Sequence, residues 1–110
     1  MQVTFEAKIS EVIIDDDEGL ISLFTKWSDI GGYLSISRDD DDQRLYCEYC
    51  DQSNGFYSET IDILIYGNIV KFKLGNTESF SKTELIQEVN IIFKKNIDEV
   101  ISCIDELKSV

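Results

Sequence analysis

The N-terminal two thirds of the chain alternate apolar and polar positions, which predicts a β-rich region. Val3, Phe5, Ala7 and Ile9 alternate with polar residues at the period of a half-buried strand, which can continue to Ile14. Further short segments of strand character follow between turn residues. They cover residues 20–27, 33–38, 44–50, 56–66 and 69–74. The last two flank a Gly-Asn pair, which predicts a hairpin.

The pattern changes after residue 74 to one of helical spacing. Residues 81–84 read Ser-Lys-Thr-Glu, a capping box that marks the start of a helix. Apolar residues then recur every three or four positions from Leu85 to Leu107. The spacing predicts one amphipathic helix over about 82–108, or two helices separated near Asn96.

These patterns together predict an α+β fold in one domain, residues 1–110. The strand-rich part is 1–74 and the helical part is 81–108. No helical crossover separates the strands, so we expect an antiparallel sheet of about six strands. The C-terminal amphipathic helix should pack on one face of that sheet.

The strong negative charge of the chain limits the kinds of molecule that it is expected to bind. The net charge is −12, and residues 1–59 hold 14 acidic and 4 basic side chains, so this half carries most of the excess. Direct nucleic-acid binding needs a basic face, so we expect none. A basic protein partner is the natural complement of such a chain. Acidity that serves solubility alone is the plainer interpretation.

The cysteines and the termini indicate a compartment. Three cysteines, an odd number, occur without a secretion signal or a membrane-length apolar run. We therefore expect free thiols, a cytoplasmic location and no membrane contact. Cys47 and Cys50 form a C-x-x-C motif, but residues three apart on a strand point to opposite faces. A zinc site would also need four ligands, so we predict no metal here.

Candidate catalytic chemistry is sparse. The chain has no histidine, which excludes Ser-His and Cys-His nucleophiles. The acidic stretches 15–18 and 39–42 lack the spacing of a calcium-binding loop. We predict no cofactor and no enzymatic activity. The alternative, a small metal-dependent hydrolase or phosphodiesterase, would need carboxylates from different strands to converge in a pocket.

Five aromatic residues lie on the predicted strands, and most of them should pack in the core or on the sheet. Those that remain exposed beside the acidic residues are candidate interface anchors, because tyrosine is enriched at binding hot spots. The five are Tyr46, Tyr49, Phe56, Tyr57 and Tyr66.

Residues 33–74 resemble the tenth family of bacterial polymorphic-toxin immunity proteins, to which contact-dependent growth inhibition immunity proteins are close functional relatives. The similarity consists of an arginine-ended strand, an acidic loop, a Tyr-x-Glu strand, an Asp-Gln turn with a glycine, and a hairpin. The positions that carry it are Tyr33, Leu34, Arg38, Tyr46, Glu48, Asp51, Gln52, Gly55, Ile61, Ile69 and Leu74.

The resemblance implies a cytoplasmic antitoxin that binds one cognate toxin domain, a basic nuclease, and neutralises it. Negative charge is densest around the strand 44–50, so we expect the acidic residues that bracket it to meet this partner. These predicted contact residues are Asp39, Asp40, Asp41, Asp42, Glu48 and Asp51.

Overall fold

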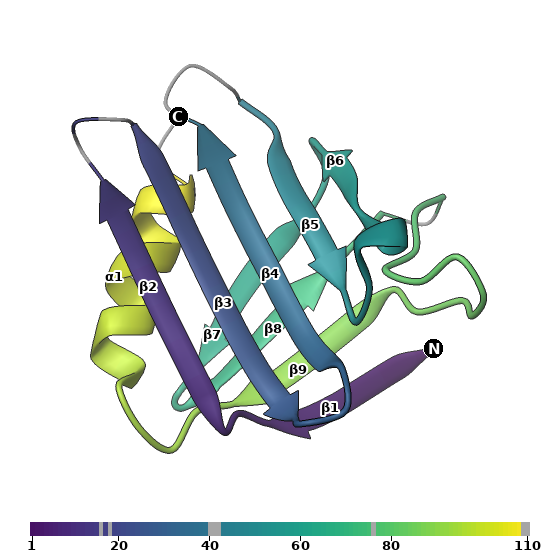
Figure 1. Ribbon diagram of the computed structural model, residues 1–110, viewed down its shortest axis with the longest axis horizontal. Coiled ribbons are helices and arrows are strands. Elements are labelled where there is room, and N and C mark those ends of the chain that lie inside the picture. Colours follow the sequence, from purple (N-terminus) through teal and green to yellow (C-terminus); the bar gives the residue numbers. More distant parts are fainter. Residues whose placement is uncertain (16, 18, 40–42, 76, 109–110) are drawn as a thin grey trace.

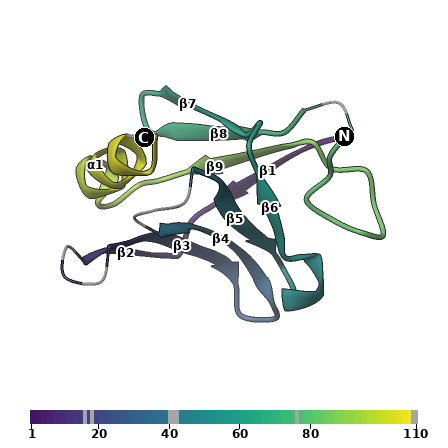
Figure 2. The ribbon, with the colours of Figure 1, turned by 90° about the horizontal axis from the view of Figure 1, so that it is seen from above.

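Two β-sheets pack face to face, and one helix closes a side of the sandwich (Figures 1 and 2). The computed structural model describes residues 1–15, 17, 19–39, 43–75 and 77–108, with only the backbone of Asp39 described. Within these ranges the chain forms nine strands, one short 3₁₀ helix and one α-helix. The predicted α+β class, with an antiparallel sheet and a C-terminal helix, is confirmed.

The first sheet has five strands, and all of its pairings are antiparallel. Three of its strands match the predicted segments 20–27, 33–38 and 44–50. In spatial order the sheet contains β2 (Ile9–Asp15), β3 (Leu20–Ser28), β4 (Gly32–Asp39), β5 (Leu45–Tyr49) and β6 (Phe56–Ser58). Consecutive strands are neighbours, so the sheet is a simple meander.

The second sheet was not predicted. It contains, in spatial order, β1 (Gln2–Glu6), β9 (Glu88–Ile92), β8 (Ile69–Lys73) and β7 (Asp62–Tyr66). The hairpin of β7 and β8 is confirmed. The predicted strands 2–14 and 56–66 are each divided between the two sheets, and β1 pairs with β9 in parallel. A parallel pair is possible because the rest of the chain lies between these two strands in sequence.

The prediction of helix from residue 82 was wrong for the segment before Asn96. Residues 88–92 form β9, in the interior of its sheet. Val89, Ile91 and Phe93 are fully buried, which is a strand period. Because the segment is rich in β-branched residues, strand pairing prevails over the helical spacing that it also satisfies.

The capping box does not begin a helix either. The Ser81 hydroxyl accepts hydrogen bonds from the backbone N–H groups of Thr83 (3.2 Å) and Glu84 (3.3 Å), as a helix N-cap would. The chain instead turns back, and the N–H of Phe80 donates to the carbonyl of Ile86 (2.8 Å). The local signal is thus present in the structure without the helix that usually follows it.

The predicted break near Asn96 is the true start of the α-helix. Asn96 has a φ of 44°, and its carbonyl accepts the first helical hydrogen bond, from Val100 (3.1 Å). Helix α1 (Ile97–Lys108) packs its buried side against β2 and β3. The residues it buries are Val100, Cys103, Ile104 and Leu107.

The core lies between the two sheets. Leu23, Leu34 and Ile36 of the five-stranded sheet belong to the same buried cluster as Phe72 and Val89 of the other sheet. Arg38, a position of the family resemblance, is also buried, and its Nη2 donates to the carbonyl of Glu106 at 2.7 Å. This cation near the end of α1 offsets the negative end of the helix dipole. Both the second sheet and the helix therefore cover the inner face of the five-stranded sheet.

Candidate partner-binding surface

The outer face of the five-stranded sheet, the face turned away from the core, is covered by no other described element (Figure 2). Alternation with the buried positions fixes which side chains it carries. They are Ile9, Glu11 and Ile13 of β2, Ser22, Phe24 and Lys26 of β3, Tyr33, Ser35 and Ser37 of β4, Tyr46 and Glu48 of β5, and Tyr57 of β6.

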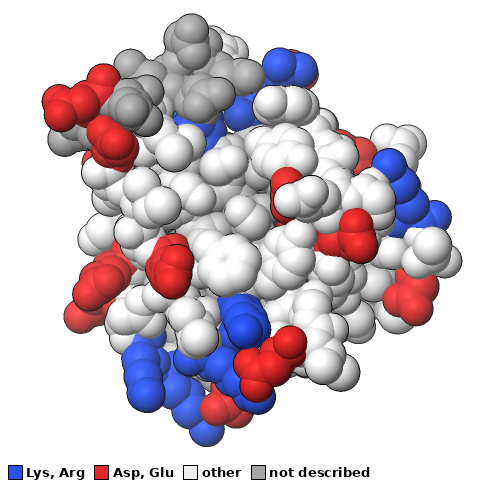
Figure 3. Space-filling view, in the orientation of Figure 1, with Lys and Arg blue, Asp and Glu red and all other residues white. Residues whose placement is uncertain are grey.

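Three of these twelve side chains are charged, namely Glu11, Lys26 and Glu48. Figure 3 looks onto the outer face and shows a largely uncharged middle, with most of the charged side chains toward the margins. Two aromatic pairs lie on it: Phe24 with Tyr33, at 5.6 Å between ring centroids, and Tyr46 with Tyr57, at 5.1 Å. Tyr57 keeps 53% of its surface exposed. Aromatic side chains left open to solvent on a flat face are typical of protein interfaces.

Glu48 lies between these aromatic pairs, where two tyrosine hydroxyls hold its carboxylate. Tyr33 Oη donates to Glu48 Oε2 at 3.1 Å, and Tyr46 Oη donates to Glu48 Oε1 at 2.9 Å. We call these three residues the tyrosine–glutamate site. Each carboxylate oxygen has one donor, and no ion pair reaches Glu48 from the described residues. The site is therefore oriented by hydrogen bonds but keeps its negative charge.

The two tyrosines remain hydrogen-bond donors over a wide pH range. Burial, followed by the hydrogen bond to Glu48, raises the pKa of Tyr33 from 10.0 to about 12. The hydrogen bond to Glu48 is the main cause that raises the pKa of Tyr46. Both hydroxyls are thus protonated at physiological pH and orient the carboxylate.

Asp51, another predicted contact residue, lies just past the end of β5. Its side chain accepts a hydrogen bond from the N–H of Ser53 (2.8 Å) and caps the 3₁₀ helix Gln52–Asn54. That backbone hydrogen bond lowers the pKa of Asp51. Asp51 also adds to the negative potential that raises the pKa of Tyr33, so it lies near the tyrosine–glutamate site.

Asp39 lies at the opposite end of the sheet. It ends β4, six residues beyond Tyr33, which places the two backbone positions roughly 20 Å apart along the strand. Asp40, Asp41 and Asp42 lie outside the described residues. The structure thus brings Glu48 and Asp51 together but separates them from Asp39.

The topology places a second acidic segment beside Asp39. The strands β2 and β4 run in the same direction, so the ends at Asp15 and Asp39 lie at the same edge (Figure 1). Leu20 pairs with both of these residues, so they are two strand spacings apart, roughly 10 Å. Asp15 Oδ1 accepts a hydrogen bond from the N–H of Asp17 (3.1 Å). We call this edge, with Asp15, Asp17 and Asp39, the acidic end.

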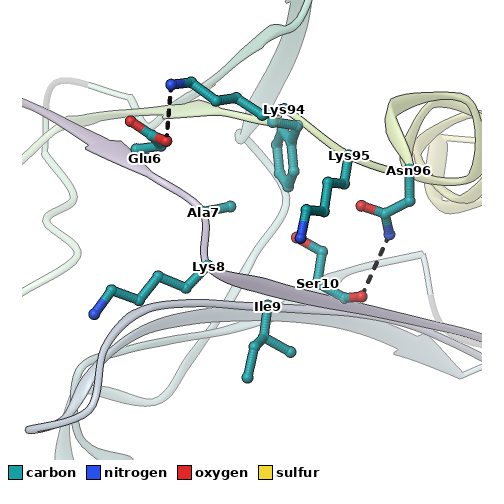
Figure 4. A pocket seen from close by; sticks show the side chains of 9 residues that line it. Glu6, Ala7, Lys8, Ile9, Ser10, Lys94, Lys95 and Asn96 are labelled. Carbon is teal, nitrogen blue, oxygen red and sulfur yellow. Dashed lines mark hydrogen bonds and ion pairs between the residues drawn. The ribbon is translucent and has the colours of Figure 1, made fainter.

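The other end of the sheet carries lysines together with carboxylates, among them Asp51 and Asp29, which forms an ion pair with Lys26 at 3.3 Å. Lys8 and Lys26 are joined there by a backbone hydrogen bond of 2.8 Å. A pocket of about 570 Å³ opens between the β1–β2 bend and the link from β9 to α1. Its lining includes Lys94, which forms an ion pair with Glu6 at 3.1 Å, and Lys95 (Figure 4). The lysines of the described residues on this sheet thus lie at the end away from the acidic end, and the pocket contacts only the edge of the outer face.

The cysteines are not part of the tyrosine–glutamate site, although the backbone N–H of Cys50 donates to the carbonyl of Tyr33 at 2.9 Å. Cys47 and Cys103 are buried free thiols, and burial raises the pKa of Cys47 to about 12 and that of Cys103 to about 11. Cys50 is a half-buried free thiol just past β5, where its φ is 62°.

The described part of the chain groups no three cysteines or carboxylates in a way that could hold a metal ion. Its one α-helix is too short to cross a membrane.

No protein-family model, curated protein or solved structure gave a match to this chain. The resemblance to the tenth immunity family consequently stays a prediction.

Sequence reasoning named Glu48, Tyr46 and Tyr57 but missed Tyr33 and Phe24 as members of the outer face. Finding Tyr33 requires the register between β4 and β5, which the sequence alone does not give. Glu48 pairs with Ser35, so Tyr33 is the diagonal neighbour of Glu48 on the adjacent strand. Of the other aromatic candidates, Tyr49 is buried and Phe56 packs against the core, while Tyr66 is exposed on the second sheet.

Proposed function

We propose that this protein is a cytoplasmic immunity protein, a non-enzymatic inhibitor that binds and neutralises one cognate bacterial toxin domain, a basic nuclease. The observation that supports this most is the outer face of the five-stranded sheet. It is broad, aromatic and uncovered, and its one central acidic group has no cationic partner among the described residues.

The acidic end of the sheet favours a basic partner in one orientation. Its basic surface would approach the acidic end, with Asp15 and Asp39, and its apolar parts would meet the aromatic middle. Complementary potentials of this kind accelerate encounter and select the binding register. The alternative, a hydrolase, requires carboxylates that converge in a pocket. Glu48 pairs with Ser35, and Asp39 lies four residues further along β4, so the two positions are roughly 13 Å apart along the sheet.

The experiment uses the C-terminal domain encoded by the gene immediately upstream of this one. Purified protein is titrated calorimetrically into that domain, and the nuclease activity of the domain is measured in parallel. We expect one-to-one binding in the nanomolar range or tighter, with nuclease activity that falls in proportion to the bound fraction. Absence of binding at micromolar concentrations, together with no protection of cells that express the domain, contradicts the proposal.

A further inference from the structure

The tyrosine–glutamate site holds a negative charge that the described part of the chain does not neutralise. A carboxylate offers about four lone-pair positions, and the hydroxyls of Tyr33 and Tyr46 occupy one on each oxygen. The remaining positions on the two oxygens are left for a further donor. Since both tyrosines are neutral donors, they fix the carboxylate plane without removing its charge.

The surroundings of Glu48 suit a flat cation. The ring pair Phe24–Tyr33 lies on one side and the pair Tyr46–Tyr57 on the other. A guanidinium group stacks on aromatic faces and donates two parallel hydrogen bonds to one carboxylate, whereas an ammonium group does neither as well. The face already shows this chemistry, because the Arg44 guanidinium carbon lies 4.5 Å from the centre of the Tyr57 ring.

The chain also leaves space for the Tyr46 hydroxyl to take this position. Gly55 lies against it so closely that a Cβ atom at residue 55 would overlap the hydroxyl oxygen. The backbone of Gly55 is extended, with φ −64° and ψ 135°, so other residues could adopt its conformation. The absence of a side chain at this position is thus explained by the position of Tyr46.

We propose that the tyrosine–glutamate site is a receptor for one arginine side chain of the partner protein, which pairs with Glu48 and stacks against the neighbouring rings. That the arginine belongs to a toxin domain rests on the proposed function above. A second copy of this chain is a poor donor, because two molecules of net charge −12 repel each other.

The first test uses a small probe and no toxin. Protein labelled with ¹³C in its tyrosine rings is titrated with N-acetyl-arginine amide, and separately with N-acetyl-lysine amide, while NMR spectra are recorded. We expect saturable shifts of the Tyr33 and Tyr46 ring signals with the arginine probe, and binding about tenfold weaker with the lysine probe. Equal binding of the two probes overturns the proposal.

Three variants locate the probe. Glu48→Gln and Gly55→Ala should each weaken arginine binding about tenfold, the first through charge and the second through displacement of Tyr46. Glu11→Gln removes the same charge from β2 on the same outer face and should leave the binding unchanged. A loss in Glu11→Gln as large as that in Glu48→Gln would mean general electrostatic attraction and would overturn the proposal.

The second test separates the arginine site from the immunity function. If the toxin domain encoded upstream binds wild type but binds Glu48→Gln equally well, the arginine site is wrong and the function stands. If the arginine probe binds at Glu48 and the toxin domain does not bind at all, the function is wrong and the site stands. A wild-type dimer that Glu48→Gln dissociates would assign the arginine to a second copy and overturn the choice of partner.

Discussion

Glu48 lies on the outward face of the five-stranded sheet and Glu88 on that of the four-stranded sheet, and their environments differ. Each is a half-buried glutamate on the outward face of a strand. Glu88 lies 3.8 Å from Lys71 and 3.8 Å from Lys73, so its charge is compensated within its own sheet. Glu48 has two tyrosine hydroxyls and, within the described ranges, no cation. The comparison teaches that a carboxylate on the outer face of the five-stranded sheet is held by neutral donors, whereas its counterpart on the four-stranded sheet is held by cations.

Replacing each glutamate by glutamine should give the largest contrast. Glu48→Gln leaves the partner's arginine buried and unpaired, so we expect toxin binding to weaken by about 2–5 kcal/mol, mainly through faster dissociation. Glu88→Gln removes an equal charge from the other sheet and should change the dissociation rate less than about twofold. Surface plasmon resonance measures both rates. Similar losses in the two variants would remove the distinction between the sheets.

Neutralising the acidic segment should act on association. With Asp39 to Asp42 changed to Asn, we expect an association rate about tenfold lower at low salt, because exposed charges act mainly by long-range steering. The salt dependence of that rate should also flatten, since screening acts over roughly 8–10 Å at physiological ionic strength. Stopped-flow kinetics at two salt concentrations measure both effects. Equal association rates for wild type and variant at low salt would show that these aspartates do not steer the partner.

Removing single hydroxyls should have intermediate effects. Tyr33→Phe and Tyr46→Phe each delete one hydrogen bond to a charged group, so toxin affinity should fall about fivefold to tenfold. Fold is checked by circular dichroism. Tyr66→Phe, an exposed tyrosine on the second sheet, is the matched control and should leave affinity unchanged. An effect of Tyr66→Phe equal to that of the other two would contradict the assignment of the interface.

Alkaline titration tests the same contacts without a partner. The raised pKa of Tyr33 means that its contribution to folding stability is complete below pH 10 and is lost as the pH rises toward about 12. Glu48→Gln should lower the pKa of both Tyr33 and Tyr46, so two of the five tyrosines should ionise at lower pH. Ultraviolet absorbance of tyrosinate measures this. An unchanged titration curve in Glu48→Gln would show that the hydroxyls do not bind the carboxylate in solution.

The smallest effect is expected for stability in Glu88→Gln. The two lysine contacts of Glu88 are long and partly exposed, so their loss should change the free energy of unfolding by about 0.5 kcal/mol or less. Urea denaturation measures it. A loss of several kcal/mol would mean that the second sheet depends on this ion network, and that the two glutamates differ for a structural reason.

The meander of β2 to β5 could be predicted because each of its strands is short, alternating and bounded by turn residues. Gly19, in the turn between β2 and β3, has a φ of 70°, a conformation that glycine adopts readily. The second sheet could not be predicted, since β1 and β9 are separated by most of the chain and periodicity carries no information on distant pairing. Residues 88–93 satisfy both helical and strand spacing, and tertiary packing decides between them.

In the candidate site too, local features could be predicted from the sequence and contacts between distant residues could not. Glu48 was predicted from local charge density, but its role depends on Tyr33, a neighbour only through the β4–β5 register. The nearness of Asp15 to Asp39 was within reach of the sequence, because alternate turns of a meander lie at the same edge. It is not evident when the acidic stretches 15–18 and 39–42 are considered one at a time, without the order of the strands.

The most direct measurement maps the partner onto the two sheets. Isotope-labelled protein is mixed with the unlabelled toxin domain encoded upstream, and cross-saturation NMR identifies the residues in contact. Our account predicts that saturation reaches Phe24, Tyr33 and Tyr46 and leaves Lys71 and Tyr66 unaffected. Saturation confined to the outward residues of the four-stranded sheet, with Tyr33 and Tyr46 unchanged, would contradict it.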